Sequence, residues 1–437
     1  MPANILNLPD YNVLSVKNTD DDYHIEAEIK STPTHCVNCK SAELVGFGKR
    51  EQLVKDLPMH GRRVGIYVSV RRVKCKSCAK TFSEQLPQVD TERFMTKRLL
   101  DWIGKAAIRR TFTSIAEEVG IVEGTVRSIF RDYIKQLQRT VKFETPHWMG
   151  IDEIHLIKPR GVITNIQNNT VVEVLSDRNK KTVADYLFRL HGRDNIKYVA
   201  MDMWRPYREA VEVVLPQATI VIDKFHVVRL ANDAMESIRK SLRSDLSAKQ
   251  RRGLMHDRFV LLKRNRELDD QERFNLDGWM QNYPILGEAY KLKESFFEIY
   301  SHRNRESAHK AYQAWAKSIP PELNEAFSPL KSAVGNWSPY IFSYFDHPIT
   351  NAYTESLNNL IRVMNRLGRG YSFEALRAKI LFSEGAHKIS KPRPKFERRS
   401  EIMYDTLDYG LSVSVERGKN YGADISTLIR LIENGQI

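Results

Sequence analysis

Three carboxylates stand at points where an α/β protein usually carries its chemistry. Asp152 lies in the apolar run "WMGIDEIHLI", Asp202 ends the apolar run "IKYVAMD", and Glu355 lies near the start of "NAYTESLNNLIR". Carboxylates that converge raise one another's pKa, and cations relieve that repulsion. Two Mg²⁺ or Mn²⁺ ions, about 3.5–4 Å apart on such oxygen ligands, can activate a water or a 3′ hydroxyl and stabilise a leaving oxygen. The three acids therefore indicate a two-metal centre for phosphodiester chemistry.

Each acid also has an ordinary structural explanation. Asp152 and Asp202 are also explained as strand-end acids without a partner, and Glu355 as an acid that the helix dipole favours in a first turn. Glu153 competes with Asp152, but alternation along a strand points its side chain to the opposite face. The metal hypothesis therefore requires elements that bring all three acids to one point.

The segment from residue 148 to residue 223 predicts such elements. A strand carrying Asp152 is followed by two strands in "GVITNIQNNTVVEVLSD", a helix in "KKTVADYLFRLHG", a strand ending at Asp202, a helix opened by Pro206, and a strand before Asp223. This order predicts a mixed α/β sheet with acids at its strand ends. In a ribonuclease H-like sheet the first and fourth strands are neighbours, and a helix packed beside them can aim Glu355 at the same point.

The four cysteines form two C-x-x-C pairs, and the chain has no others. Two such knuckles bring four thiolates to a tetrahedral Zn²⁺. The alternating stretch "GRRVGIYVSVRRVKC" predicts a strand that leads into the second knuckle. Reduced thiols without metal are the alternative, and no thioredoxin-like pattern supports a redox role. We expect a structural zinc site on the four cysteines: Cys36, Cys39, Cys75 and Cys78.

The stretch "TFTSIAEEVGIVEGTVRSIFRDYIKQL" predicts a helix-turn-helix. Ala116 precedes Gly120 by four residues, and Val126 and Ile129 carry the apolar face of a second helix. An ordinary helical hairpin shares this pattern. The polar side chains of the second helix are the candidate DNA contacts: Thr125, Arg127, Ser128 and Arg131.

The fold class that follows is multidomain α/β. We expect a zinc-binding module, a helix-turn-helix, and a ribonuclease H-like mixed-sheet catalytic core interrupted by an all-α insertion, in which Trp279 and Trp315 are anchors. The basic stretch "KISKPRPKFERRS" is interpreted as a mobile arm or a strap against phosphates. The expected segments are 1–88 (zinc-binding module), 89–143 (helix-turn-helix), 144–230 with 336–390 (catalytic core), 231–335 (insertion) and 391–437 (C-terminal tail).

Charge and hydropathy narrow the function classes. A net charge of +14 and a pI near 9.4 favour a polyanionic partner, nucleic acid first. No apolar run reaches about eighteen residues, so no membrane span is expected. The start lacks the pattern of a signal peptide, so we expect a cytoplasmic, nucleoid-associated protein.

The ordered set of motifs resembles one known family. The two Cys knuckles, the helix-turn-helix, "GIDE", "AMDMW", "DKFHV" and "NAYTESLNNLIR" follow the order of bacterial insertion-sequence transposases of the ISL-three family, over about residues 30 to 390. The resemblance implies a DDE transposase whose metal-binding triad is Asp152, Asp202 and Glu355. It also implies double-stranded DNA partners (terminal inverted repeats and target DNA) and a homo-oligomer, a dimer on DNA.

The motif "DKFHVVR" resembles the D-x-x-H signature of related transposases, which places Asp223 and His226 near the active site. His226 is interpreted as orienting the scissile phosphate or the leaving strand, and a packed histidine at a strand–helix junction is the alternative. One departure is Ser356, where the family usually has glycine after the third acid. Two other functions stay open: a DNA-binding regulator with zinc and helix-turn-helix modules, and a ribonuclease H-like nuclease without strand transfer.

Overall fold

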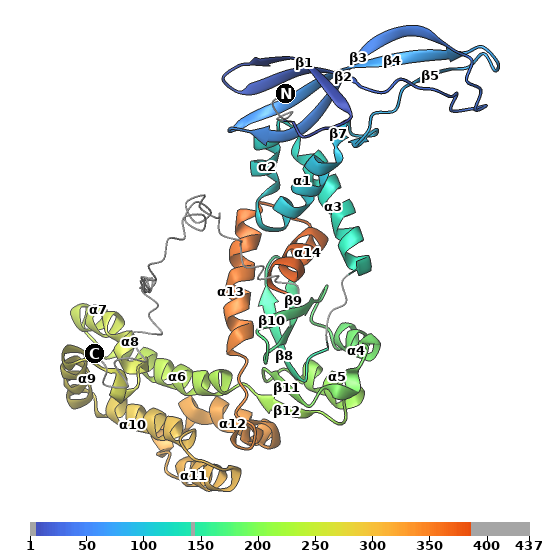
Figure 1. Cartoon of the computed structure of the whole chain (residues 1–437). Helices are drawn as coiled ribbons and strands as arrows, with labels where there is room; N and C mark the ends of the chain where they lie inside the picture. Colours follow the sequence, from blue (N-terminus) through green and yellow to red (C-terminus); the bar gives the residue numbers. More distant parts are fainter. Residues whose placement is uncertain (1–5, 141–144, 386–437) are drawn as a thin grey trace, which may run out of the picture. The chain divides into compact units, whose positions relative to one another are not determined.

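The computed structural model describes residues 6–140 and 145–385 (Figure 1). These residues belong to one compact unit, Met1–Lys388. The basic stretch "KISKPRPKFERRS" and the expected C-terminal tail lie outside the described residues. Within the described residues, no helix combines the length and the apolar character that a membrane span requires.

A seven-stranded sheet comes first in the chain. Its strands pair in the order β1-β2-β4-β3-β7-β6, with β5 on β4. The predicted strand before the second knuckle is confirmed as β4, whereas β1 and β2 were not predicted. Buried aliphatic residues of β2, β3 and β4 form its core, among them Ile25, Val54 and Ile66. The strands are β1 (Tyr11–Asn18), β2 (Asp22–Ile29), β3 (Leu44–Met59), β4 (Arg62–Cys75), β5 (Thr81–Ser83), β6 (Val89–Asp90) and β7 (Met95–Thr96).

Three helices follow this sheet: α1 (Lys97–Arg109), α2 (Phe112–Val119) and α3 (Glu123–Thr140). The side chain of Thr111 accepts a hydrogen bond from the Ser114 N–H and so caps α2. Gly120 ends α2 in the left-handed region at φ +71°, which a glycine adopts without strain. Ala116 and Val126 are buried in the core shared by the helices. The predicted helix–turn–helix geometry is confirmed.

A five-stranded mixed sheet lies after α3, in the order β10-β9-β8-β11-β12. The strands β8 and β11 are parallel neighbours, with Ile151 opposite Met201, and β12 is parallel to β11. The predicted adjacency of the first and fourth strands is therefore confirmed. The elements are β8 (Trp148–His155), β9 (Pro159–Asn165), β10 (Thr170–Val174), α4 (Lys180–Arg189), β11 (Tyr198–Met201), α5 (Arg205–Val214) and β12 (Thr219–Ile222).

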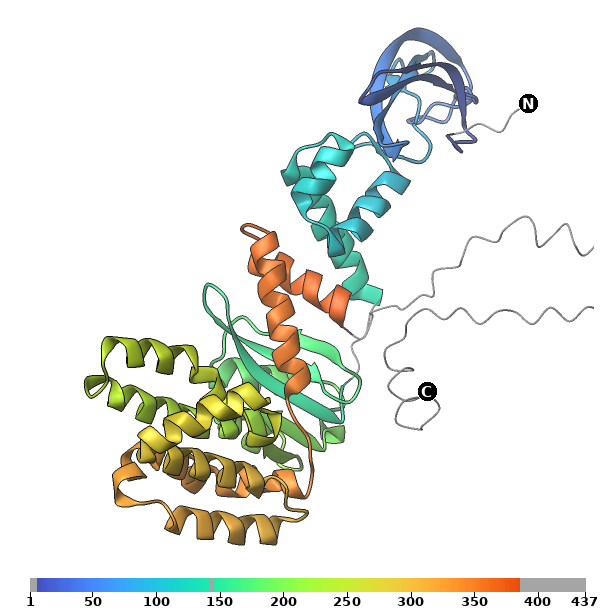
Figure 2. The same ribbon diagram turned by 90° about the vertical axis from the view of Figure 1, so that its left-hand side faces the viewer.

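The two faces of this sheet are covered by different helices (Figures 1 and 2). Met149 and Ile151 pack in one core cluster with residues of α4 and α5. Ile154, on the other face of β8, packs in a second cluster with residues of α13 (Ala352–Leu367) and α14 (Phe373–Glu384). Gly150 and Asp152 have the same parity as Ile154, so they lie on the α13 face.

A run of helices separates β12 from α13. Trp315 is buried and donates its indole N–H to Leu292 O at 2.9 Å, and half-buried Trp279 donates to Asp257 Oδ2 at 2.8 Å. The predicted anchoring by both tryptophans is confirmed. The helices are α6 (Lys224–Ser241), α7 (Ala248–His256), α8 (Arg258–Leu262), α9 (Asp270–Asn282), α10 (Pro284–Ile299), α11 (Arg305–Lys317) and α12 (Asn324–Ile341).

A buried lysine joins α14 to the three N-terminal helices. The ammonium of Lys379 donates to the carbonyls of Ala107 and Arg110 and lies 4.7 Å from the ring centre of Phe112 and 4.8 Å from that of Tyr371. Burial lowers the pKa of Lys379 to about 8. Carbonyl oxygens and aromatic faces are the partners that a buried ammonium requires. The helix-turn-helix and α14 are thus held in one core.

Candidate active site and zinc site

Asp152 and Asp202 lie next to each other on the α13 face of the central sheet. Ile151 pairs with Met201 across the parallel strands, and each acid is the next residue. Asp152 is only 5% exposed. Burial, followed by the charge of Asp202, raises the pKa of Asp152 to about 8. Two carboxylates share one poorly hydrated site, and that arrangement is unfavourable without a cation.

His226 lies among three of the predicted acids. Its Nδ1 is 2.9 Å from Asp202 Oδ1, 3.3 Å from Asp223 Oδ2 and 3.8 Å from Glu355 Oε1. Asp223 is the N-cap residue of α6, and His226 lies in the first turn of that helix. Burial opposes the charge on the imidazole, but the close carboxylates of Asp202 and Asp223 outweigh it and raise the pKa of His226 to about 10.

Glu355 reaches this cluster from α13. It lies in the first turn of the helix, as the dipole argument expects, and its side chain is 43% exposed. Burial, followed by the charge of Asp223, raises the pKa of Glu355. Glu355 therefore satisfies the helix dipole and also adds a carboxylate to the cluster. The structure brings Asp152, Asp202, Asp223, His226 and Glu355 together, as the sequence predicted.

The residues present fit a hard divalent cation. Donor atoms of Asp152, Asp202 and His226 lie within 4.8 Å of one another, and so do those of Asp223, His226 and Glu355. Asp202 Oδ1 is buried and lies 2.9 Å from His226 Nδ1 as an ion pair, but it accepts no hydrogen bond within the described part of the chain. A buried carboxylate oxygen without a donor is costly, and a cation would satisfy it.

Contacts between buried polar groups seat α13 on β8 and β9. Thr354 Oγ1 lies 2.7 Å from Thr164 Oγ1 on β9 and also bonds Asn351 Oδ1. Asn351 donates through its side chain to Ile151 O at 3.3 Å. A Cβ on Gly150 would lie closer than 3.0 Å to atoms of all three polar side chains. Glycine at position 150 therefore permits the close approach that delivers Glu355.

Glu153 is directed elsewhere, as strand alternation predicts. Its carboxylate pairs with the guanidinium of Arg178. Arg178 also lies over the ring of Trp204, 4.5 Å from its centre. The competing assignment of Glu153 as the first acid of the cluster is therefore not supported by the geometry.

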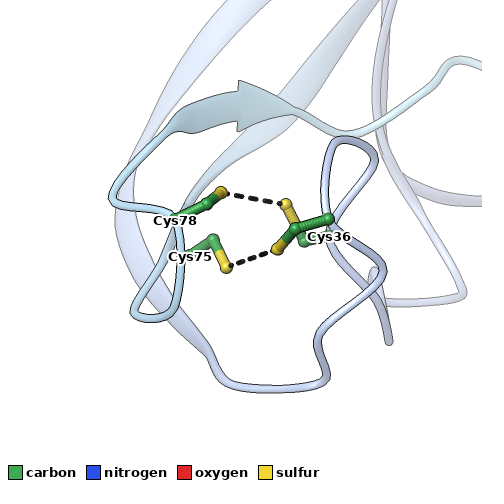
Figure 3. A group of neighbouring side chains, drawn as sticks. Cys36, Cys75 and Cys78 are labelled. Atoms are coloured by element: carbon green, nitrogen blue, oxygen red, sulfur yellow. Dashed lines mark hydrogen bonds between the residues drawn. The ribbon is translucent and has the colours of Figure 1, made fainter.

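The four cysteines form one cluster, and Figure 3 shows Cys36, Cys75 and Cys78 facing one another. Sγ of Cys36 is 3.7 Å from that of Cys78, and Sγ of Cys39 is 3.5 Å from that of Cys75. Sulfur atoms in a tetrahedral zinc site are about 3.8 Å apart, given Zn–S bonds of about 2.3 Å. A hydrogen bond from the backbone N–H of Cys39 is the largest cause that lowers the pKa of Cys36, which falls to about 6. The spacing of the sulfur atoms fits a structural zinc.

Comparison with known families agrees with this geometry. Residues 149–380, more than half of the chain, match a family model described as a transposase. Residues 32–78 match the zinc-finger of transposase IS204/IS1001/IS1096/IS1165, and residues 84–134 match the helix-turn-helix domain of transposase family ISL3. This chain belongs to transposase family ISL3.

Proteins of similar sequence include two transposases of insertion sequences. The transposase for insertion sequence element IS1001 from Bordetella parapertussis is 25% identical over 329 residues, which are 73% of this chain and 80% of that protein. The transposase for insertion sequence element IS1557 from Mycobacterium tuberculosis (strain CDC 1551 / Oshkosh) is 24% identical over 322 residues, 67% of this chain and 72% of that protein.

The ISL3 helix-turn-helix domain presents part of the predicted DNA-contacting set. Arg127 and Arg131 are exposed on α3, and Arg127 pairs with Glu123 at 2.6 Å. Thr125 and Ser128 are half-buried, and Ser128 Oγ accepts from Arg93 at 3.3 Å. Ser128 is therefore less available for DNA than the sequence pattern suggested.

Sequence reasoning missed the polar residues that support this ISL3 site. Asn351, Thr354 and Asn358 are at most 3% exposed and lie on the buried side of α13. Asn358 donates to Asp152 Oδ2 at 2.8 Å. These three residues are three and four positions apart, the spacing of residues on one face of a helix, and the apolar Leu357 and Ile361 follow the same spacing. This periodicity was the signal in the sequence that the polar residues face the core.

Proposed function

We propose that this ISL3 transposase is a DDE enzyme that cleaves DNA at the ends of its insertion sequence and joins the freed 3′ ends to target DNA. The observation that carries the proposal is the convergence of Asp152, Asp202 and Glu355 around His226, just beyond the last parallel pair of β8 and β11. Asp152, Asp202 and Glu355 would hold Mg²⁺ or Mn²⁺. When bound, such ions would activate the attacking oxygen and stabilise the leaving one.

The chain's own groups have distinct proposed tasks. The parallel strands β8 and β11 fix Asp152 and Asp202, and the seating of α13 completes the set with Glu355. His226, which shares its Nδ1 among the carboxylates, is proposed to orient the scissile phosphate or the leaving strand. Asp223 is fully buried and holds His226 through the contact at 3.3 Å.

We propose the following division of labour along the chain. Residues 1–88 with the four cysteines and residues 89–143 with Arg127 and Arg131 bind the terminal inverted repeats as part of a dimer on DNA, in the bacterial cytoplasm at the nucleoid. Phosphate contacts supply affinity that depends on salt, and a few base contacts supply specificity. The all-α insertion was expected to end at residue 335, but its last helix, α12, continues to Ile341. We therefore propose that the catalytic core resumes after Ile341.

The all-α insertion is proposed to guide flanking DNA or the partner protomer. Its α7 carries the exposed basic pair Arg251 and Arg252. Arg252→Ala is expected to weaken strand transfer most at low salt and to make it less dependent on salt, because one phosphate contact fewer releases fewer counterions. Unchanged strand transfer at every salt concentration would contradict this part of the proposal.

The experiment that tests the function follows cleavage and joining separately. A labelled duplex carrying the element's own ends is incubated with the full chain, Mg²⁺ and a plasmid target. Nicking followed by joining of the 3′ ends is the expected result. Nicking without joining would support a nuclease, and end binding without nicking would support a DNA-binding regulator.

A further inference from the structure

Asn358 links the helix that carries Glu355 to the carboxylate of Asp152. It lies one turn after Glu355 on α13 and is 3% exposed. Its Nδ2 donates to Asp152 Oδ2 at 2.8 Å and to Glu153 O at 3.3 Å. The other oxygen of Asp152 accepts from the Glu153 N–H at 2.7 Å. Both carboxylate oxygens of Asp152 are thereby held in a defined orientation.

The other end of the same amide has no partner. Asn358 Oδ1 is buried and accepts no hydrogen bond from any group in residues 6–140 or 145–385. An unpartnered buried amide oxygen is destabilising. The other buried positions of α13 are Thr354, whose hydroxyl is hydrogen-bonded, and the apolar Leu357 and Ile361. Packing alone would favour an apolar side chain at position 358, so the asparagine requires another reason.

Its chemical type suits the task of holding a metal-binding carboxylate. An amide donates a hydrogen bond without bringing a positive charge, whereas a lysine or arginine here would compete with a cation for Asp152. An acid would instead add another negative charge to Asp152, Asp202 and Glu355. Groups that orient metal-binding side chains affect metal affinity without touching the ion.

We propose that Asn358 is a positioning residue that fixes the Asp152 carboxylate for the divalent cation of the catalytic centre. This inference rests on the proposed function, because it takes Asp152 as a cation ligand. Glu355 and Asn358 lie three residues apart on one helix, so docking of α13 places a carboxylate and an orienting amide together. The same docking step completes the centre and aligns Asp152.

The test measures binding of Mn²⁺ to the full chain without DNA, by the loss of the free-ion electron paramagnetic resonance signal. Asn358→Leu keeps the side chain's shape, removes the donor and removes the unpartnered oxygen. We expect it to weaken Mn²⁺ binding about 10–100-fold, while the unfolding midpoint of the metal-free protein stays close to that of wild type, because the lost donor and the removed unpartnered oxygen offset each other. A residue with a purely structural role would not produce this combination.

Controls separate this inference from the proposed function. Asn359 is the next residue on α13, is exposed, and accepts from Arg362 at 2.8 Å. Asn359→Ala is expected to bind Mn²⁺ as wild type does, and Asp152→Asn to bind it weakly. If Asp152→Asn binds weakly while Asn358→Leu and a second variant, Asn358→Ala, bind normally, the role of Asn358 is overturned alone. If Asp152→Asn binds normally, the metal centre and the inference both fall.

Discussion

Asp152 and Asp202 occupy equivalent positions on two parallel neighbouring strands, each one residue beyond the paired Ile151 and Met201. This register places two carboxylates side by side although 50 positions separate them in the sequence (202 − 152). The helix α13 then brings Glu355 to the same point from a part of the chain beyond the all-α insertion.

Replacement of Asp152 by asparagine tests whether this carboxylate does chemistry. We expect Asp152→Asn to lower the nicking rate by about 10³-fold, or about 4 kcal/mol of barrier, because the cation loses a charged ligand. Glu153→Gln is the matched control, since Glu153 is directed to Arg178 and should keep most of the activity. Equal losses in the two variants would point to damage of β8 and not to a role for Asp152.

The stability of the metal-free protein should depend on pH through Asp152. Burial and Asp202 raise the pKa of Asp152 from 3.8 to about 8. The folded protein holds this proton to a higher pH than the unfolded chain does, so the stabilisation is complete below about pH 4 and is lost as pH rises toward 8. In EDTA, the unfolding temperature of wild type should fall relative to Asp152→Asn between pH 5 and 8. Parallel curves would contradict the shift.

Gly150→Ala should loosen the contact that delivers Glu355. The added Cβ would meet atoms of Thr164, Asn351 and Thr354 at less than 3.0 Å. We expect a loss of about 1–3 kcal/mol in the free energy of unfolding, measured by denaturant titration, together with reduced nicking. Gly335→Ala in α12 is the control, because a Cβ there meets no atom within 4 Å and the helix gains propensity. Unchanged stability of Gly150→Ala would show that α13 is not seated as described.

The cysteine cluster should hold zinc that is required for folding of the knuckles. Cys75→Ser is expected to lose nearly all bound zinc by elemental analysis and to expose residues 32–78 to protease, because structural zinc supplies folding energy there. Ser77→Ala is the control: Ser77 Oγ bonds Ser41 Oγ at 2.7 Å and is no ligand. Full zinc content in Cys75→Ser would refute the four-thiolate site.

Asp202 and the cysteines were predictable because the end of an apolar run and the spacing of a knuckle are local features of the sequence. The predicted strand-end position was wrong for Asp152, which lies within β8 (Trp148–His155). Asp202 follows an apolar run directly, and Cys75 and Cys78 sit at metal-binding spacing. Asn351 and Asn358 were not predicted, since a polar residue on a helix ordinarily faces solvent and only the tertiary contact with β8 shows them buried. The sequence pattern also could not show that these amides contact the backbone and acids of a strand about 200 residues away.

In the helix-turn-helix, too, the local pattern was predictable from the sequence and the contacts with residues outside the motif were not. Ala116, Gly120 and Val126 were predictable because short-range packing and a left-handed turn impose their types. The partial engagement of Ser128 was not, because its partner Arg93 lies outside the motif.

Nicking of a labelled duplex with the element's own ends in Mg²⁺, compared between wild type and Glu355→Gln, tests the central claim most directly. Wild type should nick, and Glu355→Gln should nick about 10³-fold more slowly while binding the ends with the same affinity, because only a ligand of the catalytic cation has been lost. Equal nicking by both proteins would return Glu355 to a helix-dipole role and contradict the three-carboxylate centre.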